Sequence, residues 1–282
     1  MIKFGPSGAD ELFEAQCGGD FEKMPQWLRE KMDLDACEYA FNLGIRVSDA
    51  KAKKIGENAK KFGIEVTAHA PYYINFANPS EEFEFKNNAY IISSLKKLQL
   101  MGGRRLTVHI GTQGKAERTA CLELIKERLI SLKKVLDEND LHDCMICFET
   151  MGKYSQIGTF EELAPLTNLD DRYSLTLDFG HINCTMQGGL KNENDYDNIF
   201  KYLFSVMPKE KVQNVHIHFS KILYNAKGEI KHSTFDDFAE PPFEPLAKVL
   251  KKYNVNSVII CESRGTQAQD SQKMKKIFEK TL

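Results

Sequence analysis

Short apolar runs of strand type alternate with longer, charged segments of helical period along the whole chain. The strand-type runs are rich in β-branched and aromatic residues, whereas the segments between them repeat their apolar residues every three or four positions. Eight runs occur, at residues 2–5, 36–41, 64–70, 105–110, 145–149, 173–178, 214–219 and 257–262. Alternation of this kind predicts an α/β protein with a parallel sheet.

Eight consecutive strand–helix units predict a (β/α)8 barrel, the TIM barrel, which commonly reaches about 250 residues as one domain. A doubly wound open sheet is the main alternative, because periodicity alone does not show closure. No linker-like stretch divides the sequence, so we expect residues 1–282 to form a single domain. The longest irregular part, at about residues 220–245, is expected to be an elaborated loop after the seventh strand.

The composition limits the classes of partner. There are 38 lysines and arginines against 40 aspartates and glutamates, a net charge of −2, so any contact with nucleic acid must be local. The seven scattered cysteines predict reduced thiols and a cytoplasmic location. The sequence starts without a signal-peptide pattern, and no run approaches the roughly 18 apolar residues of a membrane span. We therefore expect no membrane association.

Histidines and carboxylates gather where the predicted strands end. In a barrel of this type the catalytic residues lie at the carboxyl ends of the strands. Each residue alone is most simply a hydrogen-bonded core residue, but so many on one rim are costly to bury unless a cation binds them. Imidazole and carboxylate are the usual ligands of zinc, with manganese as an alternative. The expected ligands are His69, His109, Glu149, Asp178, His181, His216, His232 and Glu262.

The number of ligands predicts two or three metal ions, because three histidines and one carboxylate would suffice for one zinc. Two ions held together suit an in-line displacement at phosphate, since they stabilise the attacking and leaving oxygens at once.

In their order along the chain, these motifs resemble the endonuclease IV family of zinc-dependent apurinic/apyrimidinic endonucleases. The segments that carry the resemblance are AHAPYYIN (68–75), VHIG (108–111), FETMGK (148–153), LDFGHIN (177–183), HIHFSK (216–221) and ICES (260–263). The resemblance implies a trinuclear zinc centre. His69, His109 and Glu149 would hold the first ion, and Glu149 would bridge to a second. The remaining ligands would be Asp178, His216 and Glu262 for the second ion and His181 and His232 for the third.

The resemblance also implies an activity, which is cleavage of double-stranded DNA 5′ to an abasic site by a zinc-bound hydroxide. Glu262 would orient or deprotonate the attacking water, with Glu149 as the second catalytic carboxylate. Tyr72 and Lys221 would bind the substrate. The sequence suggests no obligate protein partner, so we expect a monomer.

Two segments depart from the family pattern. Ile230 stands where the family has an aspartate ligand for the third zinc, so His218, Glu229, water or phosphate must complete that site and the third ion should bind weakly. The segment FNLGIRVSD (41–49) does not resemble the family's DNA-penetrating loop.

Two other functions remain open. A sugar isomerase or epimerase of the xylose isomerase-like barrels would use Glu149, Asp178, His216 and Glu262 around one divalent ion. The two glutamates could then move a proton between sugar carbons. His69, His109 and His232 argue against this alternative, because it does not need them as ligands. A non-catalytic module that binds metal or nucleic acid is the third possibility.

Overall fold

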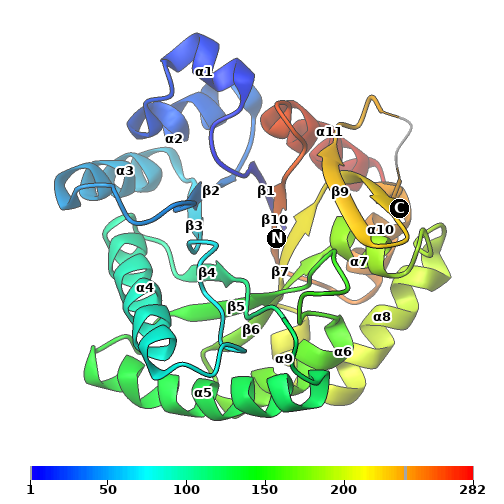
Figure 1. The fold of residues 1–282 in the computed structure, drawn as a ribbon. Coiled ribbons are helices and arrows are strands. Elements are labelled where there is room, and N and C mark those ends of the chain that lie inside the picture. Colours follow the sequence, from blue (N-terminus) through cyan, green and yellow to red (C-terminus); the bar gives the residue numbers. More distant parts are fainter. Residues whose placement is uncertain (1, 238–239, 282) are drawn as a thin grey trace.

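Eight parallel strands form the centre of the fold in a computed structural model that describes residues 2–237 and 240–281 (Figure 1). Around the barrel they follow the order β2-β3-β4-β5-β6-β7-β10-β1, so each strand pairs with its neighbours along the chain. The eight strand-type runs of the sequence are confirmed. The strands are β1 (Lys3–Pro6), β2 (Ala36–Ala40), β3 (Glu65–His69), β4 (Arg105–Val108), β5 (Met145–Glu149), β6 (Tyr173–Asp178), β7 (His216–Phe219) and β10 (Val258–Cys261).

Closure of the barrel occurs between β1 and β2. Ser7 and Glu38 form a parallel bridge there, and the Gly8 amide donates to the Glu38 carbonyl at 2.9 Å. Gly5 permits this approach, since a Cβ at that position would lie 1.8 Å from the Ala36 carbonyl oxygen. The contact favours the predicted closed barrel over the open sheet.

Helices surround the strands on the outside (Figure 1). They are α1 (Glu11–Cys17), α2 (Met24–Trp27), α3 (Asp49–Phe62), α4 (Glu81–Leu100), α5 (Arg118–Glu138), α6 (Phe160–Leu163), α7 (Phe179–Thr185), α8 (Glu193–Val206), α9 (Lys209–Val212), α10 (Phe243–Lys252) and α11 (Gln267–Lys280), with 3-10 helices at Phe21–Lys23 and Ala164–Leu169 and a π-helix at Leu28–Met32. Gly63 ends α3 with φ 65°, a left-handed conformation that glycine adopts without steric cost. No helix in the described ranges is long and apolar enough to cross a membrane.

Two apolar clusters are separated by the wall of strands. The large one fills the space between strands and helices, and Phe4, Leu175 and Ile217 belong to it. A small one consists of Ala36, Val258 and Ile260. Side chains alternate across a strand, so these three residues share the inner face with Glu38 and Glu262. The barrel interior is thus apolar only in part, and its polar layers lie above this cluster.

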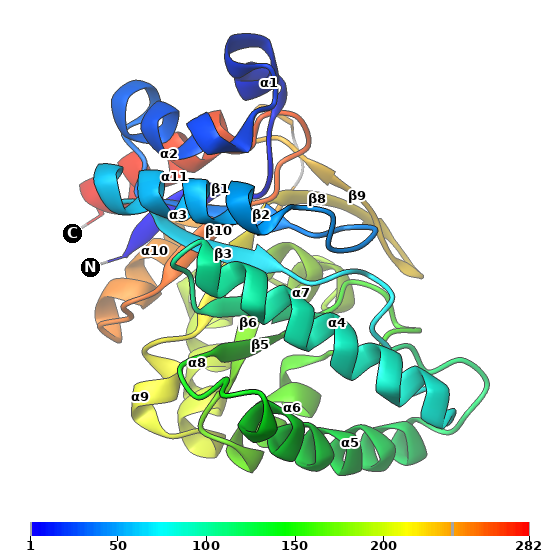
Figure 2. The same ribbon diagram turned by 90° about the vertical axis from the view of Figure 1, so that its left-hand side faces the viewer.

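The segment after β7 differs from the expected irregular loop. It forms an antiparallel hairpin of β8 (Lys221–Asn225) and β9 (Gly228–Ser233). The side view shows the hairpin at the end of the barrel opposite the two chain termini (Figure 2). Residues 238 and 239, in the same predicted loop, lie outside the described residues. The hairpin brings ordered backbone to the carboxyl ends of the strands.

Candidate metal centre

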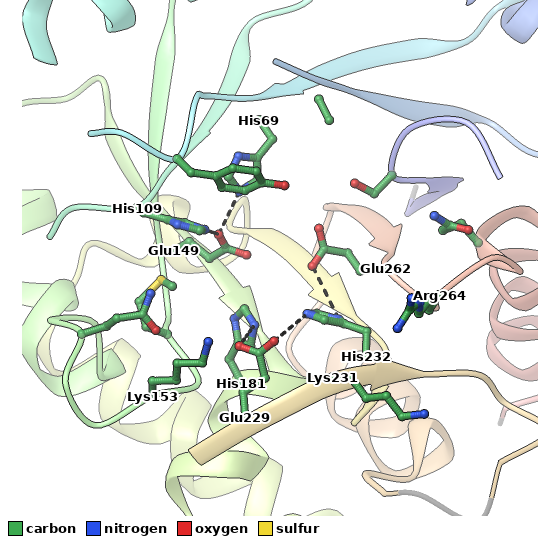
Figure 3. A pocket seen from close by; sticks show the side chains of 16 residues that line it. His69, His109, Glu149, Lys153, His181, Glu229, Lys231, His232, Glu262 and Arg264 are labelled. Carbon is green, nitrogen blue, oxygen red and sulfur yellow. Dashed lines mark hydrogen bonds and ion pairs between the residues drawn. The ribbon is translucent and has the colours of Figure 1, made fainter. Parts of the chain in front are cut away.

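A cavity of about 530 Å³ opens at the carboxyl ends of the strands (Figure 3). Its walls carry many of the expected site residues, although these come from strands and loops far apart in the sequence. The lining includes His69, Tyr72, His109, Glu149, Lys153, His181, Glu229, His232, Glu262 and Arg264. The donor atoms in and beneath this cavity form four groups, in each of which they lie within 4.8 Å of one another.

The first group joins the ends of three neighbouring strands. Glu149 Oε2 lies 3.1 Å from His69 Nε2 and 2.6 Å from His109 Nε2. His69 Nδ1 donates to the Ala70 carbonyl at 2.8 Å, so a neutral His69 imidazole would direct its Nε2 lone pair at this position. The group has the composition that the sequence predicted for a first ion.

The second group shares Glu149 with the first and adds Asp178, His218 and Glu262. His218 Nδ1 lies 2.9 Å from Glu149 Oε1 and 3.4 Å from Glu262 Oε1. Asp178 Oδ1 accepts from the His181 amide at the start of α7, whereas the buried Oδ2 has no hydrogen-bond partner in the described part of the chain. A buried carboxylate oxygen without a donor is costly, and a cation at this position would remove that cost.

His216, the expected ligand of this group, lies elsewhere. Its Nε2 is 3.2 Å from the buried carboxylate of Glu38, and the residue is fully buried beneath the cavity. Both histidines of β7 face the barrel axis, because they are two residues apart. His218 is one step nearer the carboxyl end, so it and not His216 reaches Glu149. The structure therefore groups His218 with Glu149, Asp178 and Glu262, and it groups His216 with Glu38.

The third group consists of His181, Glu229 and His232. Glu229 Oε2 lies 3.6 Å from His181 Nε2, and Glu229 Oε1 lies 3.7 Å from His232 Nε2. Glu229, one of the candidates that the sequence offered in place of Ile230, lies beside His181 and His232. A β-bulge explains the change. Leu223 pairs with Lys231 and Tyr224 with Glu229, so Ile230 is the extra residue.

The bulge turns the side chain of Glu229 to the same side as His232, although strict alternation would place them on opposite faces. Ile230 instead points outward and is 57% exposed. The sequence alone could not locate this bulge, because it depends on how β8 pairs with β9.

The fourth group contains Glu38, His216 and His218. Glu38 was not among the expected site residues. It stands alone in ACEYA on β2, where a single glutamate resembles any strand residue, and its partners lie about 180 positions away. One feature of the sequence could have pointed to Glu38. The period-two pattern of the strand places it on the same inward face as Ala36.

Charges in this region perturb one another. Burial alone would raise the pKa of Glu149, but the charges and hydrogen bonds of His109 and His218 hold it well below its usual range. Burial would lower the pKa of His69, yet its contact with Glu149 raises it to about 9. The pKa of His181 is also about 9, since Asp178 and Glu149 outweigh burial. For Glu262, burial raises the pKa. Several strongly shifted pKa values in one cavity are typical of functional sites.

Tyr72 and Lys221, the expected substrate-binding residues, differ in position. Tyr72 is 55% exposed at the cavity lip, its ring 5.8 Å from that of His69, and its hydroxyl donates to Asn42. Lys221 is absent from the lining and instead lies over the Phe235 ring at 5.4 Å. The cations that do line the cavity are Lys153, Lys231 and Arg264, which sequence reasoning missed.

Known proteins of two kinds are similar to this chain. An uncharacterised protein of Methanocaldococcus jannaschii is 29% identical over 93% of this chain and 92% of its own length. A protein named "Probable endonuclease 4" from Staphylococcus carnosus is 29% identical over 62% of this chain, and the match spans only 59% of that relative.

Solved structures of an epimerase-like protein and of an endonuclease share the fold. A D-tagatose 3-epimerase-like protein aligns with a TM-score of 0.74 at 17% identity, over 98% of this chain and 97% of that one. Endonuclease IV from Thermus thermophilus aligns with a TM-score of 0.69 at 18% identity, over 99% and 97%. The family model described as "Xylose isomerase-like TIM barrel" matches residues 28–279. The chain belongs to this family of xylose isomerase-like TIM barrels.

Proposed function

We propose that this chain is a metal-dependent phosphodiesterase of the endonuclease IV type that incises double-stranded DNA 5′ to abasic sites. The observation that carries the proposal is the set of three donor groups around one cavity, two of which share Glu149. Three adjacent groups of imidazoles and carboxylates suit three ions, and zinc is the expected metal. The relatives named "Probable endonuclease 4" support the same substrate class.

The residues of the chain fit divalent ions at these positions. Each of the three groups combines imidazole nitrogen with carboxylate oxygen, and the buried Asp178 Oδ2 of the second group has no hydrogen-bond partner among the described residues. The first ion would be held by His69, His109 and Glu149. The second would be held by Glu149, Asp178, His218 and Glu262, and the third by His181, Glu229 and His232.

Glu262 is the residue that would receive a proton from the attacking water. Its carboxylate lines the cavity, and its pKa is raised by burial, which makes it a better base than an exposed glutamate. Glu149 lies deeper and is 1% exposed, so its role is to connect the first two groups. When bound, the ions would supply Lewis acidity to the phosphate oxygens and to that water.

Cationic side chains at the lip suit a phosphate backbone. Lys153 and Arg264 line the cavity, and neither side chain forms an ion pair with any residue that the structure describes. Figure 3 shows the amino group of Lys153 on the side of His181, and Arg264 beside His232. Unpaired cations at both sides of the third group would attract a phosphodiester anion. Because the net charge of the chain is −2, any such attraction has to be local in this way.

A sugar epimerase is the second candidate. Glu149, Asp178, His218 and Glu262 supply the tetrad that such an enzyme needs around one ion, with His218 in place of the expected His216. The D-tagatose 3-epimerase-like protein shares the fold of this chain, and at 17% identity the likeness supports the fold alone. The first and third groups favour the phosphodiesterase, because a one-ion sugar enzyme leaves their histidines without a function.

The two histidines of β7 should differ in their effect on metal content. His218→Leu should remove at least one zinc per chain, because Nδ1 belongs to the second group. His216→Leu should keep the zinc content while lowering the free energy of unfolding by about 1–3 kcal/mol, since it removes a buried hydrogen bond. Elemental analysis and urea unfolding of both variants measure this. Equal zinc loss in the two variants would contradict the assignment.

The third ion should depend on Glu229 and not on Ile230. Glu229→Gln removes the negative ligand between His181 and His232, so we expect the weakest zinc to leave at a lower chelator concentration than in the wild type. Ile230→Asp, on the outward side of the bulge, should leave that concentration unchanged. Stepwise chelation with metal counting tests both. Tighter binding in Ile230→Asp would mean that the bulge does not persist in solution.

Zinc binding should release protons at pH 7.5. The pKa values of His69 and His181 are raised to about 9, so both imidazoles are protonated at pH 7.5 in the metal-free protein, whereas a ligating imidazole is neutral. Zinc affinity should therefore increase from pH 6.5 and become constant above pH 9. Calorimetric titration in buffers of different ionisation enthalpy measures the protons released. A heat that does not depend on the buffer would argue against this coupling.

The zinc-loaded protein should cut an abasic duplex oligonucleotide and leave a 3′-hydroxyl. Glu262→Gln should lower the rate about 10²–10⁴-fold, the contribution typical of a general base. Glu127→Gln, an exposed substitution on α5, is the matched control and should keep the rate. Gel analysis of the products measures cleavage. An intact abasic duplex, together with interconversion of ketose epimers, would support the second candidate instead.

A further inference from the structure

Glu38 is a fully buried carboxylate directly beneath the proposed centre, and it does not line the cavity. It lies on the inner face of β2, opposite the two histidines of β7. Neither the sequence motifs nor the ligand groups of the proposed phosphodiesterase give it a role. A glutamate buried at 0% exposure is rare unless it is paired.

Several donors converge on this carboxylate. The Thr67 hydroxyl donates to Glu38 Oε2 at 3.1 Å, and that of Thr107 lies at 3.5 Å. His216 Nε2 is 3.2 Å from the same oxygen. His218 Nε2 lies 3.2 Å from Oε1 and 3.3 Å from Oε2. An ionised carboxylate only accepts hydrogen bonds, so the Nε2 atoms of both histidines carry hydrogen.

The hydrogen on His218 Nε2 determines what its other ring nitrogen can do. In a neutral imidazole, a protonated Nε2 leaves the lone pair on Nδ1. Nδ1 is the atom that faces Glu149 Oε1 at 2.9 Å and Glu262 Oε1 at 3.4 Å. Any rotation of the ring that exchanged these directions would break the contact with Glu38 in a fully buried place, where no water could replace it.

We propose that Glu38 is the positioning residue of the metal centre, which fixes His218 with hydrogen on Nε2 and its Nδ1 lone pair directed at the second ion. The inference rests on the proposed function, because it assigns a role toward the metal. A carboxylate behind a ligating histidine orients the ring and strengthens the ligand.

Two other histidines of the centre are fixed in an equivalent way by backbone carbonyls. His69 Nδ1 donates to Ala70 O at 2.8 Å and His181 Nδ1 donates to Thr150 O at 2.9 Å, so each presents Nε2 to its group. His218 is reversed, because it comes from the middle of a strand whose carbonyls are used in the sheet. Glu38, from across the barrel, is the side chain that contacts its Nε2.

The wild-type protein provides the first test. In zinc-loaded protein labelled with ¹⁵N-histidine, long-range ¹H–¹⁵N spectra should show His218 coordinated through Nδ1 and protonated on Nε2. Coordination through Nε2 would overturn the inference while leaving the phosphodiesterase intact. So would a zinc ion bound to His216, which would make Glu38, His216 and His218 a metal site themselves. Protein that binds no zinc would overturn the proposed function, and this inference with it.

The second test uses variants. Glu38→Gln keeps the size but brings an amide N–H to face imidazole donors, so we expect zinc affinity at the second position to fall about 10- to 100-fold in chelator competition. Thr176→Val is the matched control, because its buried hydroxyl pairs with Thr107 at 3.0 Å and does not touch Glu38. It should keep the zinc affinity. Equal affinity in Glu38→Gln and wild type would overturn the inference.

Discussion

Burial of many ionisable groups at one end of a barrel is the constraint on which this structure depends. Carboxylates of Glu38, Glu149, Asp178 and Glu262 lie among buried histidines, where an unpaired charge costs several kcal/mol. Each therefore has an imidazole nitrogen close to it. Among these carboxylates, the buried oxygens Asp178 Oδ2 and Glu38 Oε1 have no hydrogen bond in the described residues. The perturbed pKa values of the histidines and of Glu149 are consequences of the same crowding.

The barrel makes the crowding possible by construction. Parallel strands that close into a ring bring all their carboxyl ends to one rim, so residues 80 or more positions apart become neighbours. The close approach of β1 and β2 at Gly5 completes the ring. It also places Glu38 of β2 across from His216 and His218 of β7. The same closure of the strands therefore forms the barrel and brings the site residues together.

Sequence reasoning predicted what depends on period and order. The eight strands, the closed barrel and the gathering of His69, His109, Glu149, Asp178, His181, His232 and Glu262 at one rim follow from the alternation of patterns and from the rule that sites lie at strand ends. It could not predict depth along a strand: period two places His216 and His218 on one face without saying which reaches the rim. It also missed Glu38, because an isolated glutamate in a strand gains meaning only from partners across the barrel.

The hairpin of β8 and β9 adds a different kind of information. Two of the three side chains in the third group, Glu229 and His232, come from β9 alone, while every other donor is fixed to the barrel or to α7. The third donor group therefore depends on the hairpin, whereas the first two depend on the barrel itself. Removal of this one short hairpin would take away two of the three side chains of the third donor group and leave the barrel strands in place. One barrel can thus gain or lose a group of ligand-type side chains through the presence or absence of a single hairpin.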